Sequence, residues 1–315
     1  MAFSTRFANG SIHCAQRWAP VALWFVALSG CDVQIPAPPA AGNPAPAAAK
    51  QEPPGCTVRG RIVSTAWRGR GGRIERAIVT AWALPESRQV AEYSEAGERF
   101  EVRLPPGKYR IVYSAVGTRG ATFEIQTREI TIGDGEDHLD VGQIDLPISK
   151  STRLYGQPAP ELGGIVAWRD TPPLALKDLR GKVVVLDFFG YYCTICHAHK
   201  PDLVKLRDQF KDQGLVVLAI HDASLKTLEE MNAKMEPVLR EVFNGNAPRL
   251  PIALDGTGDK NVFNAYGIYA VPAVILIDQQ GRIVRRYHHA GKPDLEADVR
   301  TLLTPASKSL LEKVR

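Results

Sequence analysis

Two cysteines separated by two residues, Cys193 and Cys196, stand between an apolar run and an amphipathic one. The run over residues 182–189 is rich in valine and has the length of a buried strand, whereas apolar residues after Cys196 recur at helical spacing. A second strand, a helix and a hairpin are predicted over residues 214–220, 225–243 and 273–284. Because strands alternate with helices, the C-terminal half is predicted to be an α/β domain.

A Cys-x-x-Cys pair between a strand and a helix is suited to thiol–disulfide exchange. The attacking species is a thiolate, and the partial positive charge at a helix N-terminus favours that form. Cys193 is therefore expected to be exposed, with a pKa lowered from about 8.5 towards about 7 or below. Cys196 lies on the same helix face and within disulfide reach. We predict that Cys193 attacks a substrate disulfide and that Cys196 resolves the mixed disulfide.

Further motifs surround the cysteine pair. They are Gly156-Gln157-Pro158-Ala159-Pro160, Leu179-Arg180-Gly181-Lys182, Pro201 five residues after the second cysteine, Asp187 six residues before the first, and Val271-Pro272 before an apolar strand. With these motifs, residues 155–300 resemble thioredoxin, and in particular its membrane-tethered TlpA/ResA-like branch. The resemblance implies a thioredoxin-like fold with a central mixed sheet flanked by helices.

The resemblance also implies an activity, that of a thiol–disulfide oxidoreductase and more narrowly a disulfide reductase. Val271-Pro272 matches the family's cis-proline loop, which faces the disulfide and holds the substrate chain, so Pro272 is a predicted catalytic residue. Tyr192 stands where the family usually has tryptophan, and with Val271 it is a predicted substrate contact. The resemblance implies no cofactor other than the redox-active disulfide Cys193–Cys196, and no metal is expected.

Asp187 matches the buried aspartate of thioredoxin. The TlpA/ResA-like branch often carries a glutamate two residues before the helix proline, and this chain has His199 there. Asp187 is therefore expected to be the acid–base group, as the resemblance to thioredoxin implies. Desolvation would raise its pKa, so that it can take the proton of Cys196. The alternative is a structural aspartate satisfied by local donors.

Three other functions fit some of the same residues. Cys193, Cys196, His197 and His199 form a soft-ligand cluster suited to a copper-binding chaperone on a thioredoxin fold. Cys-x-x-Cys-His is also the attachment pattern of haem c. A peroxiredoxin-type peroxidase would have threonine three residues before the attacking cysteine, where this chain has Gly190.

The N-terminal segment is predicted to be a secretory targeting signal. Residues 1–30 contain basic residues and an apolar run of ten residues, 19–28, which is shorter than the roughly 20 residues that span a bilayer. Leu28-Ser29-Gly30-Cys31 resembles the bacterial lipobox, so Cys31 is the predicted lipidation site at the end of a signal peptide. A plain signal peptide is the alternative.

Residues 31–55 are dominated by proline and alanine and are predicted to be an extended tether. The predicted location is the bacterial cell envelope, lipid-anchored and facing the periplasm. Asp32 resembles the signal that retains enterobacterial lipoproteins at the inner membrane, which favours that membrane over the outer one.

Residues 56–149 show period-two apolar patterning broken by turn signals, which predicts an all-β antiparallel sandwich. The stretches 76–81 and 104–109 resemble carboxypeptidase-regulatory-like domains, which usually have no catalytic residues. Cys56 is predicted to be a small buried residue rather than a redox sensor. The arginines of a glycine-rich loop, Arg68, Arg70, Arg73 and Arg76, are predicted to be solvated rather than bound to lipid.

Residues 150–305 are assigned to the redox domain and residues 306–315 to a C-terminal tail. The formal charge of +5 with no basic stripe argues against a nucleic-acid partner. The expected partners are proteins with disulfides or thiols, among them apocytochrome c or copper-site proteins, and a membrane thiol carrier of the DsbD type. The lipid anchor makes the membrane a further partner.

Overall fold

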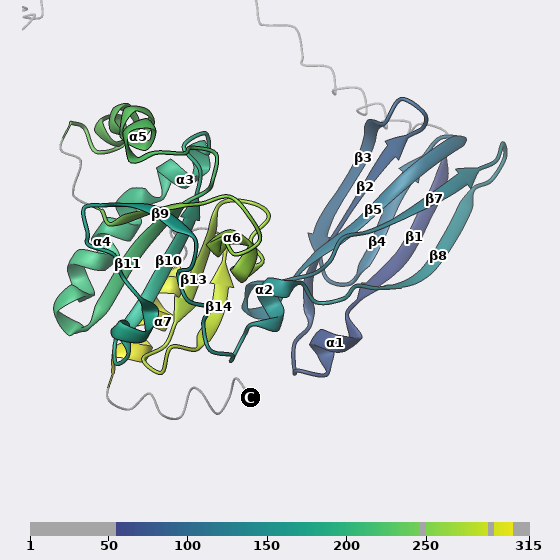
Figure 1. The fold of residues 1–315 in the computed structure, drawn as a ribbon. Helices are drawn as coiled ribbons and strands as arrows, with labels where there is room; N and C mark the ends of the chain where they lie inside the picture. The colour runs from purple at the N-terminus through teal and green to yellow at the C-terminus, as the bar shows by residue number, and fades with distance from the viewer. Residues whose placement is uncertain (1–54, 246–249, 289–292, 305–315) are drawn as a thin grey trace, which may run out of the picture. The chain divides into compact units, whose positions relative to one another are not determined.

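The computed structural model describes residues 55–245, 250–288 and 293–304 (Figure 1). Several predicted features lie outside the described residues: the predicted signal peptide over 1–30, the predicted lipidation site Cys31, nearly all of the predicted tether over 31–55 and the predicted tail over 306–315. Residues 52–315 form one compact unit. Across the described part of the chain, no helix combines the length and the apolar character needed to cross a bilayer.

Residues 56–145 form two β-sheets. The smaller has the strand order β4-β1-β8, and the larger has the order β3-β2-β5-β6 with β7 also paired to β5. The strands are β1 Cys56–Val63, β2 Ile74–Ala83, β3 Arg88–Ala96, β4 Arg99–Leu104, β5 Gly107–Gly117, β6 Ala121–Thr122, β7 Gln126–Ile132 and β8 His138–Asp145, with α1 at Thr65–Arg68 and η1 at Thr118–Gly120. Alternate residues of both sheets, such as Val58, Val79 and Ile111, are buried in one cluster, as period-two patterning requires.

One pairing departs from the predicted antiparallel arrangement. Strands β1 and β8 run parallel. A parallel pair needs a long crossover, and here all the other strands of this region lie between the two in sequence. The remaining pairs of both sheets are antiparallel.

Cys56 and the arginines of the glycine-rich loop both lie in the N-terminal sheet region, where the structure shows their burial and contacts. Cys56 is fully buried on β1 and forms no disulfide, as predicted for a packing residue. Burial raises the pKa of its thiol, which opposes the reactive thiolate. Arg68, Arg70, Arg73 and Arg76 are all exposed, as predicted for a solvated loop. Arg68 pairs with Glu98, and Arg70 donates to the carbonyl oxygens of Thr152 and Tyr155.

The C-terminal region has a six-stranded sheet with the order β14-β13-β10-β11-β12-β9. Strand β10 runs parallel to β11 and antiparallel to β13, so the predicted mixed sheet is confirmed. The strands are β9 Ile165–Arg169, β10 Val183–Phe189, β11 Leu215–His221, β12 Ile252–Asp255, β13 Ala273–Ile277 and β14 Ile283–Tyr287. The predicted strands over 182–189 and 214–220 and the predicted hairpin over 273–284 are all present.

Helices cover both faces of this sheet (Figure 1). The helical segments are α2 Lys150–Arg153, η2 Leu176–Leu179, α3 Thr194–Ala198, α4 Lys200–Phe210, η3 Lys211–Gln213, α5 Leu228–Val242, α6 Val262–Tyr266 and α7 Pro293–Leu303. Buried residues of α3, α4, α5 and α7 pack in one cluster with Val183, Val185 and Phe189 of β10, whereas α6 and η2 pack with the alternate residues of that strand. The chain is thus layered around β10, whose C-terminal end leads to the cysteine pair.

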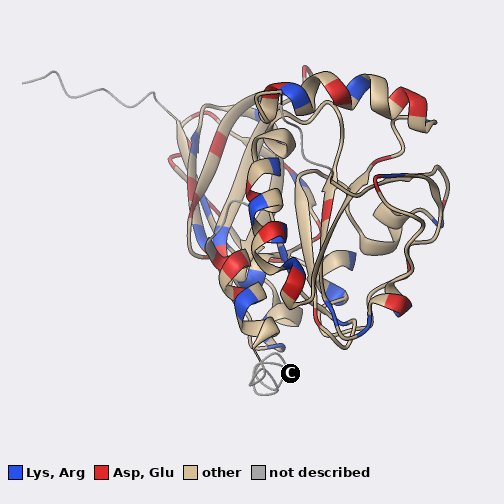
Figure 2. Ribbon diagram, turned by 90° about the vertical axis from the view of Figure 1, so that its left-hand side faces the viewer, with Lys and Arg blue, Asp and Glu red and all other residues tan. Residues whose placement is uncertain are grey.

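Charged residues of both signs are intermixed on the face drawn in Figure 2. Blue and red residues follow one another along the helices of that face, with no stripe of one sign. Such mixing is typical of a solvated surface and agrees with the modest net charge.

Candidate redox site

Cys193 and Cys196 form a disulfide directly after β10. Residues 190–192 turn the chain, Cys193 is the N-cap of α3, and the backbone N–H of Cys196 donates to Cys193 Sγ over 3.1 Å. The two sulfur atoms are 2.05 Å apart. Cys196 is fully buried, whereas Cys193 is partly exposed. An incoming sulfur atom can therefore reach Cys193 more readily than Cys196, in agreement with the predicted order of attack.

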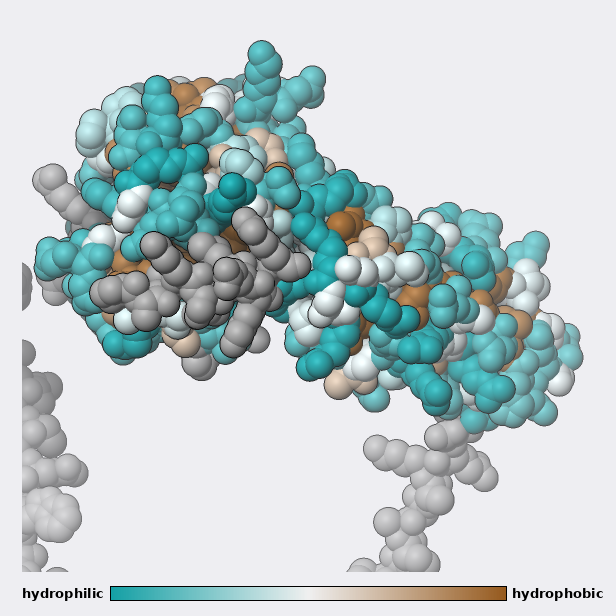
Figure 3. Space-filling model, turned by 90° about the horizontal axis from the view of Figure 1, so that it is seen from below, coloured by the Kyte–Doolittle hydropathy of each residue, from teal (hydrophilic) through white to brown (hydrophobic). Residues whose placement is uncertain are grey.

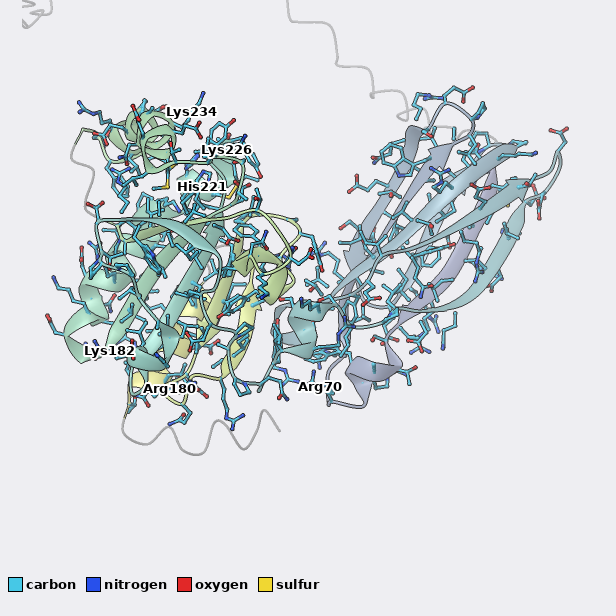
Figure 4. The ribbon with its side chains drawn as sticks, viewed as in Figure 1. Arg70, Arg180, Lys182, His221, Lys226 and Lys234 are labelled. Atoms are coloured by element: carbon cyan, nitrogen blue, oxygen red, sulfur yellow. A yellow bond between two sulfur atoms is a disulfide. The ribbon has the colours of Figure 1, made fainter. Side chains whose placement is uncertain are left out.

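Two buried histidines hold the turn that precedes Cys193. The N–H of Tyr191 donates to His221 Nε2 over 3.0 Å, and His221 Nδ1 donates to the carbonyl of Asp222 over 2.8 Å. The carbonyl of Tyr191 accepts from His197 Nε2 over 2.7 Å. Burial lowers the pKa of both imidazoles, which are therefore neutral near pH 7. In Figure 4, His221 is labelled near the α5 end of the sheet, the same end that carries Lys226 and Lys234.

Gly190 and Tyr192 complete this turn. A Cβ atom at position 190 would lie 2.7 Å from the Tyr192 ring and 3.0 Å from a carboxylate oxygen of Asp222, so a side chain there would displace the exposed Tyr192 ring. The Tyr192 hydroxyl donates to that carboxylate over 2.5 Å, which raises the pKa of Tyr192 to about 12. A threonine in place of Gly190, as a peroxidatic site would require, would disturb the contact between Tyr192 and Asp222.

Asp187 lies on the face of β10 that packs against α4. Its Oδ2 atom accepts from Lys200 Nζ over 2.5 Å, and its Oδ1 atom is 3.0 Å from His199 Nε2. Lys200 is fully buried, and its ammonium also lies 3.5 Å from the centre of the Phe189 ring. The helix break before Pro201 turns both His199 and Lys200 towards the strand, because proline cannot donate the hydrogen bond that would join α3 to α4.

The expected ionisation of Asp187 is wrong. Burial raises the pKa of its carboxyl, but Lys200 and His199 outweigh that effect and hold the pKa below its usual value. Asp187 is therefore a carboxylate in an ion pair, not a protonated acid. Burial lowers the pKa of Lys200, and the attraction of Asp187 opposes that shift.

The Val271–Pro272 peptide bond is cis, in agreement with the expectation for this loop. It immediately precedes β13, which pairs with β10, so the loop lies at the end of the strand that leads to the disulfide. Pro272 and Ile195, the residue before Cys196, line the same cavity. The arrangement places the proline loop beside the cysteine pair.

The copper ligand set is not assembled. Among the residues that the structure describes, no group of three or more histidine, cysteine, aspartate or glutamate side chains is placed to hold a metal ion. His197 donates to the backbone of Tyr191, and His199 contacts Asp187. The two histidines of the motif thus serve the turn and the buried ion pair.

Residues 155–286 match the sequence model of the AhpC/TSA family. This domain is thioredoxin-like, and its relatives include thiol–disulfide oxidoreductases. The chain is 36% identical over 159 residues to protein DipZ of Mycobacterium bovis, an alignment that covers 47% of this chain and 21% of the relative. It is 31% identical over 112 residues to the thiol–disulfide oxidoreductase ResA of Halalkalibacterium halodurans, covering 36% of this chain and 57% of the relative.

The chain therefore spans less than two thirds of the length of each of these two relatives. A solved structure of the thioredoxin domain of a thiol–disulfide oxidoreductase from Bacteroides vulgatus is 26% identical. It superimposes with a TM-score of 0.39 over 48% of this chain and 98% of its own.

Proposed function

We propose that this protein is an extracytoplasmic thiol–disulfide oxidoreductase that reduces disulfides with the Cys193/Cys196 pair. The observation that carries the proposal is the disulfide itself, with a partly exposed Cys193 at the start of α3, a buried Cys196 behind it, and the cis Val271–Pro272 loop alongside. Relatives named as thiol–disulfide oxidoreductases support the same reaction class.

The reaction transfers two electrons from the reduced pair to the substrate. The Cys193 thiolate attacks one substrate sulfur, the substrate S–S bond breaks, and the other substrate sulfur leaves as a thiolate that takes up a proton. Cys196 then loses its proton and attacks Cys193 Sγ, which forms the Cys193–Cys196 disulfide and releases the second substrate thiol. We assign Asp187 as the group that accepts the Cys196 proton, acting as the carboxylate of its ion pair.

We propose net reduction as the direction of transfer. A strong oxidant stabilises its reduced form by stabilising the thiolate. The N-terminus of α3 and the N–H of Cys196 stabilise the Cys193 thiolate, but His197 and His221, which hold the preceding turn, are neutral near pH 7 and add no positive charge. The neutral state of these two histidines favours a reductant over a strong oxidant.

The setting of the reaction is part of the proposal. A signal peptide with lipidation at Cys31 and a proline-rich tether over 31–55 would hold the working domains at the periplasmic face of the inner membrane. A membrane thiol carrier of the DsbD type would supply electrons, and apocytochrome c thiols or copper-site cysteines are suitable targets. The sheets of residues 56–145, which we assign to a carboxypeptidase-regulatory-like sandwich, would be a non-catalytic companion.

Reduction of insulin disulfides by the full chain, with dithiothreitol as electron donor, tests the activity. We expect the wild-type chain to accelerate insulin precipitation and Cys193→Ser to abolish that acceleration, whereas Cys56→Ser retains it. Acceleration that survives in Cys193→Ser would contradict the proposal. So would tight stoichiometric binding of Cu(I) that requires His197 or His199, with no reductase activity.

A further inference from the structure

A groove lies beside the disulfide, with a volume of about 820 Å³. One wall comes from the redox domain and includes Ile195, Tyr269, Val271 and Pro272. The opposite wall includes Phe123 and Ile125, from the segment between β6 and β7. We call this space the Ile195 groove.

We infer that Phe123 and Ile125 form a second wall opposite the proline loop and that this wall selects an apolar side chain of the substrate polypeptide close to the reacting cysteine. This inference rests on the proposed function and adds a substrate class to it. The N-terminal sheets then contribute directly to substrate choice, through Phe123 and Ile125.

The first support is the exposure of apolar side chains at this place. Hydrophilic residues dominate the face drawn in Figure 3, where apolar residues form only small patches. Within the described ranges, the strongly exposed large hydrophobic residues are Ile125, Val166, Tyr192, Ile195 and Tyr269, with 56–78% of their surface accessible. Three of these five line the Ile195 groove, and Tyr192 precedes Cys193. Such clustering marks a binding site, because burial of apolar surface is favourable by about 25 cal/mol per Å².

The second support is the buried guanidinium of Arg286 on β14, which also lines the groove. Arg286 is 8% exposed, and its Nε atom has no hydrogen-bond partner among the described residues. The Nε atom has almost no accessible surface, so an occupant would meet Arg286 through the small exposed part of its side chain, where a carbonyl or carboxylate oxygen is a favourable partner for the positive charge. The main chain of a polypeptide supplies a carbonyl at every residue.

The third support is that the two walls are joined by a buried hydrogen-bonded residue. The Tyr155 hydroxyl accepts from the backbone N–H of Arg286 over 3.0 Å, and it lies 3.2 Å from the carbonyl oxygens of Arg119 and Gly120. Tyr155 is 4% exposed, and its ring packs edge-on against Trp67. Tyr155 therefore joins the segment η1 to β14 by hydrogen bonds.

Position and charge identify the occupant. Ile195 lies between the two cysteines and lines the groove, so residues that flank a substrate cysteine bound at Cys193 can extend into it, advancing about 3.3 Å per residue. Lys150, Arg153, Arg286 and His288 line the groove with a single acidic residue, Glu124, which pairs with Arg153. This balance favours a neutral or acidic segment over a basic one.

The test compares two ten-residue peptides, each with one cysteine held in a mixed disulfide with 5-thio-2-nitrobenzoate. The peptides are identical except for leucine or serine two residues after the cysteine. We expect the reduced full chain to prefer the leucine peptide by about tenfold in kcat/KM. Ile125→Ser should reduce that preference to about one. The matched control Val166→Ser removes an equally exposed apolar residue outside the groove and should keep the tenfold preference.

Equal kcat/KM for the two peptides with the wild-type chain would overturn the inference, as would an unchanged preference in both Ile125→Ser and Tyr269→Ser. Failure of the proposed function would look different, because neither peptide would then be reduced. In that case, fluorescence polarisation of labelled peptides with a serine in place of the cysteine tests the groove alone. Tighter binding of the leucine peptide that is lost in Ile125→Ser supports the inference, and equal binding of both peptides overturns it.

Discussion

The Nζ atom of Lys200 lies 2.5 Å from the Oδ2 atom of Asp187, and both side chains are fully buried. Asp187 shares its face of β10 with Phe189, which packs in the same cluster as Cys196. The group that we propose as the proton acceptor for Cys196 is thus a member of a buried ion pair rather than an isolated acid.

Lys200→Met should destabilise the protein by about 3–5 kcal/mol at pH 7, because it leaves a buried carboxylate without its cation. The double variant Lys200→Met/Asp187→Asn should recover most of that loss, since both charges are then absent. Urea denaturation of the oxidised full chain measures the effect. Lys205→Met, on the exposed side of the same helix, is the control and should change stability by less than about 0.5 kcal/mol. A stable single variant would contradict the importance of the pair.

The stability of the protein should fall as the pH drops through the range of histidine titration. Burial lowers the pKa of His221 in the folded state below its unfolded value of about 6.5, so the folded state binds fewer protons. The contribution of the neutral imidazole is therefore complete above about pH 6.5 and is lost as the pH falls below it. Urea denaturation at pH 7.5 and pH 5.5 should show a smaller difference for His221→Gln than for the wild type.

His138→Gln is the matched control for that experiment, because His138 is exposed on β8. It should keep the pH dependence of the wild type. If His221→Gln shows the same loss of stability between pH 7.5 and pH 5.5 as the wild type, protonation of His221 does not destabilise the folded state.

Asp187 should act in the second step of the reaction. In the Lys200→Met/Asp187→Asn variant, attack of Cys193 on a peptide disulfide should be nearly unchanged, whereas release of the mixed disulfide should slow by about 10²-fold. The double variant is preferable to Asp187→Asn alone, because a lone buried Lys200 would both destabilise the fold and stabilise a Cys196 thiolate. Stopped-flow measurement separates the two steps. Wild-type rates for both would mean that another group accepts the proton.

The membrane anchor depends on Cys31. In a bacterial host, Cys31→Ser should release the protein from the membrane fraction or block its processing, while the reductase activity of the purified chain is retained. Cys14→Ser, which changes another cysteine of the N-terminal segment, should leave membrane attachment intact. If Cys31→Ser stays in the membrane fraction, Cys31 is not the site of a lipid anchor.

Local sequence patterns predict much of the sheet and of the reacting pair. The valine-rich run of β10 stands out in the sequence, the five-residue strands β13 and β14 stand out because a short turn joins them, and Val271-Pro272 is a motif of two adjacent residues. Strands β9 and β12 have five and four residues, and no short turn joins either of them to the strand with which it pairs, so the local sequence does not distinguish them from loops.

The ionic part of the site could not be predicted in the same way. Lys200 is 13 residues from Asp187 in sequence, and its direction depends on where the helix breaks before Pro201. A pattern centred on Asp187 alone therefore predicts an unpaired acid. The same reasoning applies to His197 and His221, whose shared partner Tyr191 becomes visible only when β11 lies beside β10.

The reduction potential of the Cys193–Cys196 couple tests the central claim most directly. The full chain is equilibrated with glutathione buffers of increasing potential, and the fraction of disulfide is read by alkylation and mass spectrometry. A reductase whose Cys193 thiolate is stabilised by the N-terminus of α3 but by no charged histidine should have a midpoint near about −270 mV. A midpoint near about −120 mV would identify an oxidant and contradict the account.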